Sequence, residues 1–324
     1  MEDKVYESIV KRPRPSLMAA GAFVLLAAAG LWLASLAVGA LAPRLWPAGA
    51  DFVALEALLD GLYYLPFMAL PVALYMIRRK GLFDAMRLNP LPAGTTLLLI
   101  PMAVMSVYVA DGLSVAWTLL LEGIGLRYNV SVPIPQNSRE LTLAILLMAA
   151  APAVCEELLF RGLVLSAWES RGTALAIGLS GALFALLHGN IFGLPVYLGL
   201  GLLMGYLVYA LDSVYAGIVF HTVYNTACLV IPYLLAPMAE QAEEAMPTGA
   251  ALMASAALDM LLTTGMVALL VNVVRMRSRL AGIRPIPRVR RPLSGGEKAM
   301  MIVLAAALLA LNAITAMEFA GGGA

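Results

Sequence analysis

Six polar side chains that could do chemistry lie inside strongly apolar stretches of the sequence. They are Glu156, Glu157, Arg161, His188, His221 and Asn225. An ionisable residue at the centre of a membrane helix costs about 2.5–3.5 kcal/mol on insertion scales, so each placement needs a reason. The chain has only two histidines, and both are in this set. Because histidine moves protons near neutral pH and a desolvated carboxylate can act as a general base, the set could activate water.

Spacing along the helices assigns these side chains to faces. Residues four apart share a helix face, so Glu157 and Arg161 are predicted to pair and to neutralise a cation inside the membrane. Glu156 points about 100° further round the helix and is therefore left for chemistry. His221 and Asn225 also share a face, which predicts a two-group clamp for one carbonyl, one water or one metal ion.

The elements that must position these residues are predicted to be transmembrane helices. Of 324 residues, 62% are hydrophobic and 13% charged, and the mean hydropathy is +0.88, which excludes an ordinary soluble domain. Stretches near the roughly 20 apolar residues that span a bilayer are 17–42, 52–77, 95–121, 141–165, 173–190, 194–211, 214–235, 250–274 and 299–319. We expect an all-α, polytopic membrane helix bundle of about eight or nine helices around a core active-site bundle. The segments 173–190 and 194–211 are short, and one alternative makes them re-entrant or strongly tilted.

The distribution of charge predicts an orientation. Lys and Arg gather in alternate connections, and the longest basic stretch runs from Arg275 to Lys298. This stretch is expected to be a cytoplasmic linker that meets anionic membrane lipids rather than nucleic acid. The pattern, with no cleavable or eukaryotic targeting signal in sight, predicts a multi-pass protein of a prokaryotic inner membrane with a cytoplasmic N-terminus.

The same residues carry a family resemblance. The run Glu156–Arg161 fits EExxxR, Phe184 with His188 fits FxxxH, and His221 with Asn225 fits HxxxN, in that order on three helices. This ordered set resembles the CPBP family of intramembrane proteases, which includes the Ras-converting type II CAAX prenyl endopeptidases and bacteriocin-processing or immunity proteins. The resemblance covers about 140–235. We therefore divide the chain into helices one to three (1–138), a catalytic core of helices four to seven (139–235), and helices eight and nine with the basic linker (236–324).

The resemblance implies a cavity open towards the cytoplasm in which water attacks a peptide bond. By position, Glu156 with His188 would activate the water, and His221 with Asn225 would stabilise the oxyanion. The neighbouring Glu/Arg pair would support the site. The substrate would be a membrane-associated protein or peptide, either prenylated and CAAX-like or of bacteriocin type, and neither that choice nor the oligomeric state can be read from the sequence.

Three alternatives stay open. Glu156, His188 and His221 could ligate Zn²⁺ with one open position, but we favour no cofactor because no HExxH pair is present and a ligating glutamate could not also serve as the base. A proton-coupled transporter could use the same residues as a relay. A non-catalytic immunity or scaffold protein could retain the fold without the reaction.

A count of depth places His188 at a different level from the other site residues. At about 1.5 Å per residue from the cytoplasmic ends, Glu156 and His221 lie roughly 11–14 Å deep, whereas His188 lies roughly 22 Å deep. Either the fifth helix tilts or starts later, or the boundaries of the segments are wrong. Glycines in this segment that allow close packing or irregular geometry are Gly178, Gly181 and Gly189.

Overall fold

The computed structural model describes residues 14–47, 52–78, 85–127, 134–242, 250–280 and 292–321, and helices are the only regular elements in these ranges. The α-helices are α2 (Leu17–Leu45), α3 (Phe52–Tyr63), α4 (Leu70–Arg78), α6 (Ala93–Gly123), α7 (Ser138–Ala144), α8 (Ala151–Glu157), α9 (Leu165–Trp168), α10 (Thr173–Leu187), α11 (Leu194–Leu211), α12 (Val214–Ala242), α13 (Ala250–Leu280) and α14 (Gly295–Gly321). The predicted all-α membrane helix bundle is confirmed.

Three π-helical turns connect some of these helices without a break. They span Tyr64–Ala69 between α3 and α4, Ile145–Ala150 between α7 and α8, and Leu158–Val164 between α8 and α9. Pro66 lies within the first turn, and Pro152 follows the second. Because proline has no N–H to donate, the regular hydrogen-bond ladder is interrupted near each of them. Such turns recur at functional sites, and two of them flank the double glutamate.

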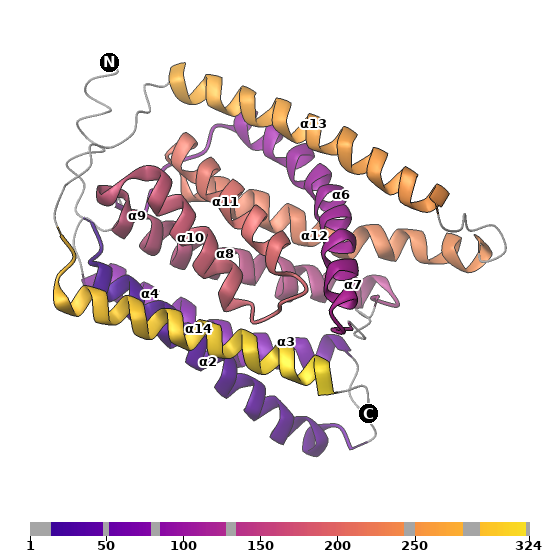
Figure 1. The fold of residues 1–324 in the computed structure, drawn as a ribbon, viewed down its shortest axis with the longest axis horizontal. Coiled ribbons are helices and arrows are strands. Elements are labelled where there is room, and N and C mark those ends of the chain that lie inside the picture. Colours follow the sequence, from indigo (N-terminus) through magenta and orange to yellow (C-terminus); the bar gives the residue numbers. More distant parts are fainter. Residues whose placement is uncertain are drawn as a thin grey trace.

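Eight helices in the described ranges are long and apolar enough to cross a membrane. The chain is thus a multi-pass membrane protein. A further apolar helix, α10, has only 15 residues and is shorter than the predicted segment 173–190. It stops because Gly189 takes a positive φ of 60°, a conformation that glycine adopts without strain. Figure 1 shows α10 and α11 inside the bundle, between α2 and α14 on one side and α6 and α13 on the other.

The predicted boundary of the fourth segment at 165 was wrong. The continuous helix runs from Ser138 to Arg171, through a closing 3₁₀ turn at Glu169–Arg171. Glu156 and His188 are therefore equally far from one end of their helices. Glu156 precedes the end of its helix at Arg171, and His188 follows the start of α10 at Thr173, by the same number of residues. The new boundary removes the difference in depth between Glu156 and His188, whereas His221 still lies only seven residues from the start of α12 at Val214.

Close contact between α10 and α11 depends on two facing glycines. A Cβ added to Gly201 would lie 2.9 Å from Gly181 Cα, and one added to Gly181 would lie 3.0 Å from the backbone nitrogen of Leu202. Only hydrogen side chains allow the two backbones to approach this closely. Of the three glycines that would allow close packing or irregular geometry, Gly181 packs closely and Gly189 takes a positive φ, whereas Gly178 faces open space.

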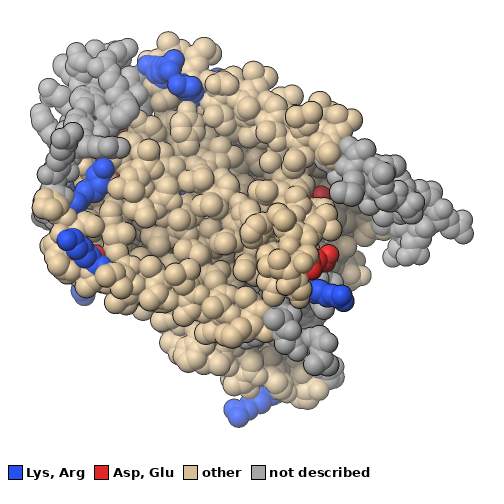
Figure 2. Space-filling model, viewed as in Figure 1, with Lys and Arg blue, Asp and Glu red and all other residues tan. Residues whose placement is uncertain are grey.

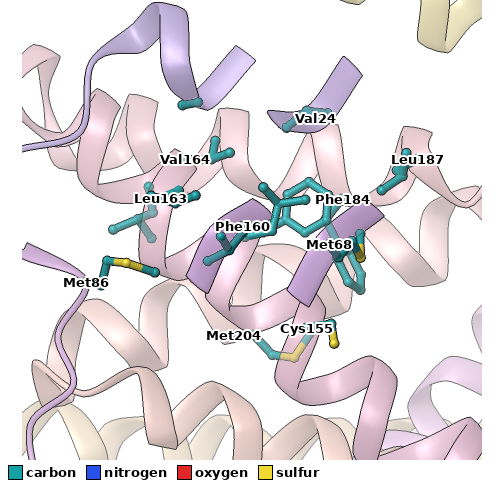
Figure 3. Close-up of a cluster of buried hydrophobic side chains, with 14 of the residues drawn as sticks. Val24, Met68, Met86, Cys155, Phe160, Leu163, Val164, Phe184, Leu187 and Met204 are labelled. Atoms are coloured by element: carbon teal, nitrogen blue, oxygen red, sulfur yellow. The ribbon is translucent and has the colours of Figure 1, made fainter. Parts of the chain in front are cut away.

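Apolar side chains fill the interior and also cover the outside. Phe160, Leu163, Phe184 and Met204 are among the buried side chains that pack together at the centre (Figure 3). On the face drawn in Figure 2, Lys and Arg lie at the margins and the broad middle carries neither sign of charge. An apolar band bounded by charges is the surface expected of a protein surrounded by lipid chains.

A buried polar network fastens the connection before α6 to the core. Arg87 donates to Glu169 at 2.6 Å, to Asp212 Oδ1 at 3.1 Å and to Ser166 at 3.2 Å, while Asn89 donates to Asp212 Oδ2 at 3.0 Å. Burial of Arg87 acts to lower its pKa, but the carboxylates of Glu169 and Asp212 act in the opposite direction, and the net result is a raised pKa. The network therefore holds a fully charged arginine between the end of the fourth span and the α11–α12 turn.

Candidate active site

A cavity of about 230 Å³ lies within the bundle and contains the predicted catalytic residues. Its lining comes from five stretches of helix and consists of Asp60, Tyr64, Met148, Pro152, Glu156, Phe184, His188, Tyr197, Leu200, His221, Tyr224 and Asn225. The four side chains predicted to be catalytic, from α8, α10 and α12, all reach this one cavity. The two predicted supporting residues lie directly behind it.

Glu156 is the carboxylate that faces the cavity. Its Oε1 accepts a hydrogen bond of 2.7 Å from the Tyr64 hydroxyl, and its Oε2 lies 4.0 Å from His221 Nε2. Only 6% of the residue is exposed. A carboxylate with one donor fixed on one oxygen and an imidazole near the other has a defined orientation towards the space between them.

Glu157 and Arg161 form the predicted pair, and both are fully buried. Arg161 Nη1 lies 2.5 Å from Glu157 Oε1, and Nη2 donates to the carbonyl of Gly201 at 3.0 Å. The guanidinium carbon also lies 4.5 Å from the centre of the Phe184 ring. The cation is thus held by a carboxylate, a carbonyl and an aromatic face. These contacts offset part of the free-energy cost of removing the guanidinium from water.

Each histidine is oriented through Nδ1. His221 Nδ1 lies 3.3 Å from Glu157 Oε1, and His188 Nδ1 lies 2.8 Å from the carbonyl of Phe184. A carbonyl can only accept, so His188 carries a proton on Nδ1 and its Nε2 is left as an acceptor when the ring is neutral. In this way backbone and carboxylate contacts select which nitrogen of each ring is available to the cavity.

Aromatic contacts fix the ring planes. Phe184 packs edge to face against both imidazoles, with ring centres 4.7 Å from His188 and 5.7 Å from His221. On its other side His188 stacks on Tyr197, with centres 4.0 Å apart and planes at 21°. The phenylalanine of the FxxxH pattern therefore touches both histidines as well as Arg161, which explains its spacing.

A comparison with known protein families identifies the segment that carries these residues. The family model described as type II CAAX prenyl endopeptidase Rce1-like matches residues 138–227. Residues 138–227 are Rce1-like. The match begins at α7, ends within α12 and includes all six predicted site residues, so the predicted family is confirmed for this segment. Searches of curated proteins and of solved structures found no match.

The Rce1-like family supports a CAAX-type intramembrane endopeptidase in general and a membrane-associated protein as substrate. Two lining residues come from outside the matched segment, because Asp60 and Tyr64 lie on the second span. The Rce1-like core is therefore completed by an N-terminal helix, and Tyr64 makes the direct hydrogen bond to Glu156.

Sequence reasoning missed four polar lining residues: Asp60, Tyr64, Tyr197 and Tyr224. Asp60 lies within the predicted span 52–77, and the cost of an intramembrane carboxylate should have drawn attention to it. The tyrosines gave no comparable signal, because a tyrosine in a membrane helix is ordinary and its partner lies on another helix.

The cavity lining includes the three possible zinc ligands, Glu156, His188 and His221. In the described ranges, no group of three or more His, Cys, Asp or Glu side chains is placed to hold a metal ion. Glu156 Oε2 and His221 Nε2 approach to 4.0 Å. The choice between a metal-dependent site and a metal-free one stays a prediction.

Proposed function

We propose that the protein is an intramembrane endopeptidase that hydrolyses a peptide bond of a membrane-associated protein or peptide with water activated by Glu156. The observation that carries this proposal is the convergence of Glu156, His188, His221 and Asn225 on one cavity. General-base catalysis needs the base within reach of the water and donors within reach of the developing oxyanion. A cavity of about 230 Å³ has room for water and for part of a peptide.

The first step forms the bond between the water oxygen and the scissile carbonyl carbon. Glu156 takes a proton from the water, while His188 Nε2 accepts a hydrogen bond from it and directs its attack. Asn225 donates its amide N–H to the oxyanion of the tetrahedral intermediate. Because His221 Nδ1–H is held by Glu157, His221 donates to the oxyanion from Nε2 with both ring nitrogens protonated, and the proposal assigns it as an imidazolium. Glu156 then returns its proton to the leaving nitrogen, and the C–N bond breaks.

The test is cleavage of membrane-tethered and prenylated peptides by purified protein, with Glu156→Gln, His188→Ala and Asn225→Ala as variants. Glu122→Gln is a matched control, because Glu122 is exposed near the end of α6. Cleavage lost in Glu156→Gln and retained in the control supports the proposal. Intact folding without cleavage of any peptide, together with proton-driven flux in liposomes, would contradict it in favour of a transporter.

The absence of a metal from the mechanism is part of the proposal. Cleavage should persist in the presence of a strong chelator, because the proposed mechanism uses Glu156 for proton transfer rather than as a metal ligand. Complete loss of cleavage on chelation, with recovery on adding Zn²⁺, would refute the metal-free step.

We also propose a prokaryotic inner-membrane location with the N-terminus in the cytoplasm. Support comes from the alternation of basic connections along the sequence. Labelling of single cysteines in intact cells tests the orientation. A cysteine placed at Asn137, just before α7, should react from outside the cytoplasm, and one placed at Gly172, just after the fourth span, should be protected.

A further inference from the structure

A second and larger cavity, of about 380 Å³, adjoins the active site. Its lining comprises Val107, Ala110, Asp111, Ser114, Thr118, Asn190, Phe192, Gly193, Val196, Tyr197, Tyr224 and Cys228. Two of these, Tyr197 and Tyr224, also line the catalytic cavity. Since both rings border both spaces, a peptide held in the catalytic cavity can place a nearby side chain in this second cavity.

Asp111 is the unusual member of this lining. It lies well inside the span Ala93–Gly123 and is exposed rather than buried against other helices. No Lys, Arg or His side chain in the described residues pairs with it, and the lining contains no basic residue. An intramembrane carboxylate costs several kcal/mol, and such residues normally pair or mark the path of a ligand.

The groups around Asp111 suit a cation. Ser114 and Thr118 follow it by three and seven residues on α6, so their hydroxyls share its helix face. Across the cavity, the rings of Tyr197 and Tyr224 supply aromatic surfaces. A carboxylate, neutral hydroxyls and aromatic faces together form the usual environment for an ammonium or guanidinium group.

The cavity is held in place by contacts with the α10–α11 connection. Trp117 on α6 donates to the carbonyl of Ile191 at 2.8 Å, and Asn190 Oδ1 accepts from the backbone nitrogen of Phe192 at 3.0 Å. The first bond ties the α6 wall to the loop that carries His188 at its start, and the second holds the conformation of that loop. The position of Asp111 relative to the catalytic histidine is therefore fixed by structure rather than left to a free loop.

We propose that the Asp111 cavity is a specificity pocket that binds a Lys or Arg side chain of the substrate, within a few residues of the scissile bond. This inference rests on the proposed endopeptidase function and extends it to substrate class. The amine of a lipid head group has the same chemistry, but it belongs at the interface, whereas Asp111 is separated from both ends of α6 by several helical turns.

Binding rather than cleavage provides the test, so that the result does not depend on turnover. Full-length protein carrying Glu156→Gln is placed in nanodiscs of phosphatidylcholine, which offers no primary amine. Fluorescent apolar peptides of membrane-spanning length carry one Lys at successive positions, and norleucine replaces that Lys in the matched set. We expect Lys to bind about tenfold more tightly than norleucine at one or two neighbouring positions.

Variants assign that preference to the cavity. Adding Asp111→Asn should make the Lys and norleucine affinities nearly equal, whereas Asp111→Glu should retain the preference for Lys. The control is Asp259→Asn, at an exposed acidic residue of α13, which should leave the preference for Lys unchanged. Thermal unfolding confirms that each variant is folded. Equal binding of both peptide sets at every position, or a Lys preference that survives Asp111→Asn in folded protein, would overturn the inference. A Lys preference in a protein that cleaves no peptide would instead support this pocket and contradict the proposed endopeptidase.

Discussion

Replacing Gly217 on α12 by alanine should damage the active site although it adds only one methyl group. A Cβ at this position would overlap Glu157 Oε2 and would lie 3.0 Å from both Glu157 Cδ and Val208 Cγ2. The carboxylate must therefore retreat by roughly 1 Å, a displacement that can cost on the order of 10²-fold in rate when it reaches the catalytic groups. Arg161 at 2.5 Å and His221 at 3.3 Å both contact the oxygen on the other side of this carboxylate.

The expected magnitude combines two opposing effects. Loss of a charge-assisted hydrogen bond costs about 1.5–3 kcal/mol. Alanine is favoured over glycine within a helix by about 1 kcal/mol, which offsets part of that loss. We expect Gly217→Ala to lower the free energy of unfolding by about 0.5–2 kcal/mol and kcat/KM for a cleaved peptide by about 100-fold.

The matched control is Gly178→Ala on α10, where an added Cβ meets nothing within 4 Å. This variant gains the same helix propensity without the overlap, so it should be at least as stable as the wild type and fully active. Thermal unfolding in detergent and peptide cleavage in nanodiscs measure the two quantities. If Gly217→Ala matched Gly178→Ala in both thermal stability and rate of peptide cleavage, the idea that Glu157 orients His221 from behind the cavity would be wrong.

Two further predictions concern contacts outside the Rce1-like motifs. Tyr64→Phe removes the 2.7 Å hydrogen bond to Glu156 and should lower kcat at least about tenfold with little change in folding. The control is Tyr215→Phe on the exposed start of α12, which should leave kcat unchanged. Equal kcat values for the two variants would exclude a positioning role for the Tyr64 hydroxyl. Arg87→Met leaves the buried Glu169 carboxylate without its 2.6 Å partner and should destabilise the protein by about 3–5 kcal/mol. Adding Glu169→Gln should recover part of that loss in stability. A double variant whose loss equals the sum of the two single losses would refute the coupling of Arg87 and Glu169.

Local patterns explain why much of the candidate site could be predicted. The i, i+4 spacing of Glu157 and Arg161 predicts a contact within one helix, and the structure contains it. The motifs identified the family for 138–227, and the apolar composition predicted the membrane bundle. The roles assigned to Glu156, His188, His221 and Asn225 stay predictions, although all four line one cavity.

Errors arose where the signal was not local. The fourth helix continues to Arg171 beyond the predicted 165, because apolar residues on both sides of a π-helical turn conceal where a helix ends. Asp60 and Asp111 were passed over, because a single carboxylate carries no motif and its environment depends on other helices. Tyr64 became visible only through its contact with a residue 92 positions away.

Composition and periodicity act within one segment, so they predicted that the chain forms apolar helices, which polar residues these helices contain and which of those residues share a helix face. Which helix faces meet depends on the folded arrangement. Glycine contacts between α10 and α11, the π-helical turns beside Glu156 and the position of the second span bring the predicted catalytic residues together with Tyr64. The same packing sets the Asp111 cavity beside them. These arrangements depend on packing between distant segments, which no spacing along the chain encodes.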